Sequence, residues 1–140
     1  MKLHLLLLLP LAFPALGLAT QPGENIDKQL QACKLHANST NDNAQCYSSA
    51  TQQWDKELNQ QYQLLIKDQP PSVREKITAA QRSWLQYRDG YNEAISTYYQ
   101  QQQGTIWRLV AAESKMNIIR DKAIDLYRLR VSTDLSAGQG

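Results

Sequence analysis

The most constraining feature of the sequence is a regular apolar pattern between residues 73 and 98. Apolar side chains recur there at alternating steps of four and three residues, which places them on one face of an α-helix. They are Val73, Ile77, Ala80, Trp84, Tyr87, Tyr91, Ala94 and Tyr98. A seven-residue repeat of this length favours packing against another helix at a small crossing angle, as in bundles. The pattern therefore predicts a long helix with one buried face.

Helix-breaking residues predict where this helix begins and ends. Two prolines at 70–71 stop the preceding helix, because proline lacks a backbone N–H and disfavours helical dihedrals in the residue before it. Ser72 and Glu75 have the spacing of a capping box, in which each side chain bonds the other residue's backbone N–H. Gly104 is a suitable helix stop. Gly90 falls inside the helix, where it predicts a bend or the close approach of another backbone.

Two further segments carry the same helical spacing. Their apolar stripes are Tyr47, Ala50, Trp54, Leu58, Tyr62 and Leu65, and Leu109, Ala112, Met116, Ile119, Ala123 and Leu126. A short helix is predicted over residues 26–36, and the polar run 38–43 after it predicts a turn. No alternating pattern long enough for a sheet is sustained. We therefore predict an all-α fold, a small antiparallel bundle of three long helices plus a short leading helix.

The first nineteen residues have the features of an export signal. Lys2 supplies a positive start, residues 3–18 are almost entirely apolar, and small residues precede the end of the stretch. We predict cleavage after Ala19, which leaves a helical domain over residues 20–131 and a flexible tail over residues 132–140. The mature protein is then expected to be periplasmic or secreted. It would have no stable membrane anchor, because no second apolar run of membrane-spanning length follows.

The two cysteines, Cys33 and Cys46, are the whole cysteine content of the chain. In an exported protein they predict one disulfide between the leading helix and the second helix, worth about 3 kcal/mol by loop closure. Two alternatives stay open at this point, a bridge between two molecules and a metal site that includes His36. The metal site lacks an obvious fourth ligand, which structural zinc sites require.

Charge and residue content exclude several classes of function. Lys and Arg total 15 against 13 Asp and Glu, so the chain lacks the strong positive excess of a nucleic-acid-binding protein. His36 is the only histidine after the predicted signal, which argues against multi-histidine metal sites and histidine-dependent triads. The sequence contains no glycine-rich phosphate loop and no nucleophile elbow. We therefore predict a protein that is not an enzyme and binds no cofactor.

Two motifs on consecutive predicted helices resemble those of a known family. The first has the form D-x-x-L-N-x-x-Y and the second the form A-Q-R-x-W-x-x-Y-R-D. They comprise Asp55, Leu58, Asn59 and Tyr62, and Ala80, Gln81, Arg82, Trp84, Tyr87, Arg88 and Asp89. In order and spacing they are similar to the N-terminal domain of the LprI-type lysozyme inhibitors. The resemblance implies a small exported helical domain of bacteria, in a family named for a member that inhibits lysozyme.

The motif residues can also be interpreted as a polar clasp between two helices. Helical spacing places each motif's polar residues on one face, and we expect the two faces to meet. Arg88 can then pair with Asp55 or Asp89. Asn59 and Gln81 can satisfy buried backbone groups, with Trp84 as the apolar bulk. We favour this structural role, with a partner-binding surface as the alternative.

Two classes of function are compatible with these features. The first is steric inhibition of lysozyme by a loop or basic side chain placed in its sugar-binding cleft, where catalytic carboxylates attract Arg or Lys. The candidate contacts are Lys67 and Arg74 beside the double proline, and Arg108 near Gly104. The second is an adaptor domain that binds another envelope protein through exposed aromatic residues. That patch would include Tyr91, Tyr98, Tyr99 and Trp107.

Overall fold

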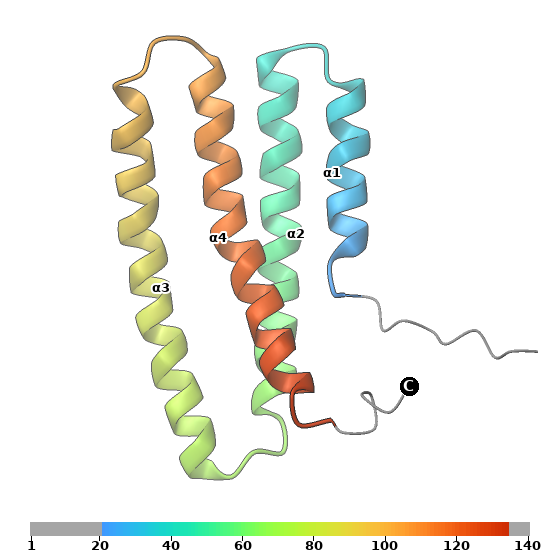
Figure 1. The fold of residues 1–140 in the computed structure, drawn as a ribbon, viewed down its shortest axis with the longest axis vertical. Coiled ribbons are helices and arrows are strands. Elements are labelled where there is room, and N and C mark those ends of the chain that lie inside the picture. Colours follow the sequence, from blue (N-terminus) through green and yellow to red (C-terminus); the bar gives the residue numbers. More distant parts are fainter. Residues whose placement is uncertain (1–20, 135–140) are drawn as a thin grey trace, which may run out of the picture.

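The computed structural model describes residues 21–134, which contain four α-helices and no strand (Figure 1). The helices are α1 (Glu24–His36), α2 (Thr40–Ile66), α3 (Pro71–Gln100) and α4 (Ile106–Val131). Consecutive helices run in opposite directions, as in an antiparallel bundle. The predicted all-α class, with three long helices and a short leading one, is confirmed. The predicted export signal and residues 135–140 of the predicted tail lie outside the described residues.

The helices α2 and α4 form the centre of the bundle, and α1 packs beside α2 (Figure 1). The stripes predicted for α2 and α4 supply most of the core cluster. Trp54 is 0% and Leu58 2% exposed, and Met116 and Ala123 face them from α4. Burial of each large apolar side chain contributes about 1.5–3 kcal/mol to the free energy of unfolding.

The start of α1 is fixed by contact with this core. Gly23 precedes the helix with a φ of 78°, a left-handed conformation that glycine adopts readily. It also lies against the indole of Trp54, so closely that a Cβ at this position would collide with the ring. Both the backbone conformation and the available space therefore require glycine here.

The helix α3 packs much less extensively. Figure 1 shows α4 between α3 and the α1–α2 pair over the upper part of the bundle. Within α3 only Gln81 and Ile95 are buried. Much of the stripe predicted as its buried face is instead exposed, including Val73, Tyr87, Tyr91 and Tyr98. The predicted burial holds in part for Ile77 and Trp84, which pack against the core. It is wrong for the exposed residues, because α2 and α4 already cover each other and α3 packs along one side of α4.

The beginnings of α2 and α3 also differ from the predicted boundaries. The Ser39 hydroxyl accepts a hydrogen bond from the backbone N–H of Asp42 at 3.0 Å, so it caps α2 and residues 40–43 are helical rather than a turn. Pro71 opens α3, and no side-chain cap is formed there. The predicted Ser72 capping box is therefore wrong. Proline suits the first helical position because its missing N–H would be unpaired there in any case.

The other end of α3 agrees with the sequence, whereas its interior does not. The helix ends at Gln100, and Gly104 adopts a φ of 109° in the following turn. The helix continues through Gly90, where a Cβ would meet nothing within 4 Å. The predicted close approach of another backbone at Gly90 is therefore wrong.

Candidate functional site

The predicted partner-binding residues lie at opposite ends of the bundle. Lys67 follows the last residue of α2, and Arg74 lies in the first turn of α3. Arg108 lies in the first turn of α4, at the far end of α3 (Figure 1). The 30 residues of α3 span about 45 Å. One enzyme cleft cannot accept both ends together, so Lys67 and Arg74 form one candidate site and Arg108 another.

The loop between α2 and α3 holds Lys67 and Arg74 around one shallow hollow. Both side chains are exposed, and both line the hollow together with Leu64 and Asp68. The Arg74 guanidinium donates a hydrogen bond of 3.4 Å to the backbone carbonyl of Gln69. Asp68 has a φ of 61°, a left-handed conformation that is uncommon for a residue with a side chain. The two cations are thus presented by a loop of defined shape.

The family-like motif is divided between the core and the surface. Leu58 and Gln81 are buried, whereas Asp55, Tyr62, Trp84 and Arg88 are half-buried and Asn59, Arg82, Tyr87 and Asp89 are exposed. One motif residue of α2 contacts α3, through a residue that precedes the second motif. The hydroxyl of Tyr62 lies 2.9 Å from that of Thr78 and forms a hydrogen bond between α2 and α3.

The other contacts of the motif differ from the predicted clasp. Arg88 pairs with Asp89 at 2.8 Å, its neighbour on the same helix, and lies over the ring of Trp84. Asn59 is exposed, and its nearest polar contact is a 3.5 Å hydrogen bond to the Asp55 carboxylate. The predicted contact of Asn59 with buried backbone is therefore wrong, since that side chain points to solvent.

Gln81 departs from the predicted clasp in a different way. Its side-chain oxygen is buried, and it has no hydrogen-bond partner among the residues that the structure describes. The predicted bond from Gln81 to a buried backbone group is absent at this oxygen, because helical backbone groups are already paired within their own helices.

A bidentate ion pair between α1 and α4 is one contact that no sequence pattern predicts. Arg120 donates hydrogen bonds to both Asp27 carboxylate oxygens, at 3.1 Å from Nε and 2.7 Å from Nη2. Its guanidinium also lies over the buried ring of Trp54, 5.3 Å from the centroid. The hydrogen bonds to Asp27 raise the pKa of Arg120, although partial burial opposes this shift. Because 93 positions separate the partners, no local pattern indicates the pair.

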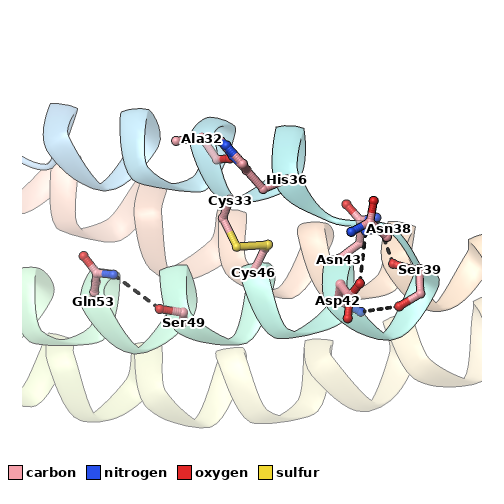
Figure 2. Close-up of a disulfide and its surroundings, with 10 residues drawn as sticks. All are labelled: Ala32, Cys33, His36, Asn38, Ser39, Asp42, Asn43, Cys46, Ser49 and Gln53. Atoms are coloured by element: carbon pink, nitrogen blue, oxygen red, sulfur yellow. Dashed lines mark hydrogen bonds between the residues drawn. A yellow bond between two sulfur atoms is a disulfide. The ribbon is translucent and has the colours of Figure 1, made fainter.

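The predicted disulfide joins α1 and α2 (Figure 2). The Cα atoms of Cys33 and Cys46 are 5.7 Å apart. Figure 2 shows His36 turned toward its own helix, with Nδ1 2.8 Å from the Ala32 carbonyl oxygen. The predicted pairing is confirmed, and the metal-site and intermolecular alternatives are wrong because each sulfur is bonded to the other. Across residues 21–134, no group of three or more His, Cys, Asp or Glu residues is placed to hold a metal ion.

Comparison with known proteins identifies the family. The family described as "Lysozyme inhibitor LprI" matches this sequence over residues 32–126. The chain belongs to the LprI family. The matched region contains both motifs and both disulfide cysteines, so the resemblance seen in the sequence is confirmed.

The LprI fold also recurs in a solved structure. The crystal structure of an uncharacterized protein from Burkholderia thailandensis is 30% identical in sequence and gives a TM-score of 0.68. The match covers 82% of this chain and 58% of that chain, so this chain spans little more than half of the other protein. Comparison with curated proteins finds no match.

Proposed function

We propose that this LprI-family protein binds lysozyme and inhibits it sterically, by occupying its sugar-binding cleft. The observation that carries the proposal is the family match, which extends over residues 32–126 and so over most of the described helices. Inhibition by binding needs an exposed, shaped surface and no catalytic residues of its own. An enzyme cleft with catalytic carboxylates is complementary to cationic side chains.

The loop between α2 and α3 is the surface that best suits this role. It projects from one end of the bundle (Figure 1), and a projecting loop can enter a concave cleft. Lys67 and Arg74 supply two exposed cations beside one hollow. Leu64, 39% exposed, adds apolar contact area at the same place. Arg108, at the other end, is the competing contact.

Export into the periplasm or to the outside of the cell is part of the same proposal. The proposed signal over residues 1–19 would direct it, and a disulfide persists in such oxidising compartments. None of the helices within residues 21–134 is long and apolar enough to span a bilayer. A lysozyme that attacks peptidoglycan would be met in the same compartment.

Lysis of a peptidoglycan substrate tests the proposal directly. Purified protein from residue 20 onward is added in increasing molar excess to c-type, g-type and i-type lysozymes. We expect dose-dependent protection against at least one class, weakened by added salt because charge pairs are screened. No protection against any class would contradict the proposal.

Charge variants then locate the contact. The double variant Lys67→Ser/Arg74→Ser should weaken protection at least tenfold, corresponding to about 1.4 kcal/mol of binding free energy. Arg108→Ser is the matched control, since it also removes an exposed cation, from the opposite end. If only Arg108→Ser weakened protection, the contact would instead lie at the α3–α4 end of the bundle.

A further inference from the structure

A groove between α3 and α4 has the size and the mixed lining of a small-ligand site. Its volume is about 530 Å³, within the range of pockets that hold small molecules. Tyr91 and Tyr98 line it from α3, and Ser114, Asn117 and Asp121 line it from α4. The two helices lie side by side in Figure 1. Neither the α2–α3 loop nor Arg108 contributes to the lining.

Exposed tyrosines line the α3 side of the groove and continue beyond it along α3. Tyr91 is 48% and Tyr98 64% exposed, and Tyr87, 57% exposed, stacks on Tyr91 with a centroid separation of 5.6 Å. Within the part of the chain that the structure describes, the three hydroxyls make no hydrogen bond. None of the three rings belongs to the core cluster. An exposed aromatic row of this kind is typical of a binding surface.

The α4 wall supplies polar groups with free hydrogen-bonding capacity. Asn117 is exposed and its amide is unpaired with respect to residues 21–134, so it offers both donors and an acceptor. Ser114 donates to the Val110 carbonyl at 2.8 Å and keeps lone pairs that can accept. Asp121 is the charged residue of the lining, and its exposed carboxylate lies 3.8 Å from the Arg120 guanidinium. No Lys or Arg lines the groove itself. An anionic ligand is therefore disfavoured.

We infer that this groove binds a neutral oligosaccharide. A pyranose ring presents a flat face of C–H groups, which stacks on an aromatic ring, and an edge of hydroxyls, which pair with amides and carboxylates. The groove offers the first on α3 and the second on α4. Tyr91 and Tyr98 are seven positions apart, about 10.5 Å along the helix axis. That separation is close to the length of two linked pyranose units.

The exposed area favours a small ligand over a second copy of the chain. Three half-exposed tyrosines present roughly 300 Å² of aromatic surface. A stable protein interface buries about 800 Å² on each partner.

Titration in the absence of lysozyme tests the site. Isotopically labelled protein is titrated with the tetramer of N-acetylglucosamine and, separately, with cellotetraose, and amide resonances are followed by NMR. We expect saturable shifts confined to residues around Tyr91, Tyr98 and Asn117, including the Asn117 side-chain amide. Saturation by either sugar supports the site, and the difference between them reports whether the N-acetyl group is recognised.

Variants and matched controls make the test specific. Tyr98→Ala and Asn117→Ala should each weaken binding about tenfold or more, whereas Ile106→Ala and Asn41→Ala, exposed positions outside the groove, should leave it unchanged. Circular dichroism verifies that each variant is folded. If Tyr98→Ala does not fold, Asn117→Ala alone still tests the site.

Three results would overturn the inference. The first is no shift with either sugar up to its solubility limit, and the second is binding by both groove variants as tight as that of the unsubstituted protein. The third is self-association that Tyr98→Ala abolishes in sedimentation, which would identify a second copy as the occupant. Because lysozyme is absent from this experiment, its outcome is independent of the proposed inhibition.

Discussion

The α2–α4 pair and α3 have the same kind of seven-residue apolar pattern but use it differently. In α2, stripe residues such as Trp54 and Leu58 are fully enclosed, whereas in α3 the corresponding residues Tyr87 and Tyr98 are more than half exposed. Periodicity therefore predicts a helix and one apolar face. Whether that face is buried depends on a partner helix at the right distance, which the pattern of a single segment does not contain.

The residue types in the two stripes are consistent with this difference. The α2 and α4 stripes contain Leu, Met and Ile, which gain only from burial. The α3 stripe is dominated by tyrosine and alanine. Tyrosine tolerates exposure because its hydroxyl stays hydrated, and alanine has little apolar area to lose. Composition alone does not decide burial, however, since the α2 stripe includes Tyr47, which is 4% exposed.

The sharpest test compares two tryptophans. Trp54→Ala should lower the free energy of unfolding by about 3–5 kcal/mol, because it empties a fully buried site. Trp84→Ala should cost about 1–2 kcal/mol, because its ring is only half-buried. Denaturant midpoints and slopes measure both. Equal losses would contradict the unequal packing of α2 and α3.

Removing the disulfide should have the next largest effect. The double variant Cys33→Ser/Cys46→Ser should lose about 3 kcal/mol, the loop-closure contribution of a bridge of this span. Native-state hydrogen exchange should quicken mainly in α1, since the bridge attaches that helix to α2. Reduction of the unsubstituted protein should give a similar loss, and the same reductant applied to the double variant, which has no bridge, is the control. Faster exchange in α3 alone would show that the bridge stabilises a different region.

Replacement of two glycines by alanine should change the free energy of unfolding in opposite directions. Gly23→Ala should destabilise by about 1–3 kcal/mol, because its Cβ would collide with Trp54 at an unfavourable φ. Gly90→Ala should stabilise by about 0.5–1 kcal/mol, because it lies in open space within a helix. Thermal unfolding of both variants under one condition provides the measurement. A lower melting temperature for Gly90→Ala would contradict the open space around this position.

The smallest expected effect concerns the bond between α2 and α3. Tyr62→Phe keeps the ring and removes the hydroxyl that meets Thr78, so we expect a loss of about 1 kcal/mol. Amide exchange in α3 should increase more than in α2. Tyr87→Phe is the matched control, since that exposed hydroxyl has no partner within residues 21–134. Identical effects of the two substitutions would mean that the bond contributes nothing.

Much of the fold follows from local physical signals. Two of these signals, the apolar stripes of α2 and α4 and the double proline between α2 and α3, depend only on neighbouring residues. A third, the single cysteine pair, allows only one disulfide within the chain. The family motif identified the family but not its own contacts, as the exposed Asn59 illustrates. The pairing of Arg120 with Asp27 depends on three helices being assembled first. The tyrosine groove likewise arises only when α3 and α4 are side by side.

The position of the Cys33–Cys46 bridge has a consequence for resistance to proteolysis. It spans the short turn at residues 37–39 that connects α1 to α2, a segment with exposed Asn38 and Ser39. A protease that cuts this turn would produce two fragments that remain covalently joined, with α1 still seated against Trp54. The nicked chain would migrate as one species without reductant and as two with it. The bridge thus keeps α1 attached to the rest of the chain even when this connection is cut.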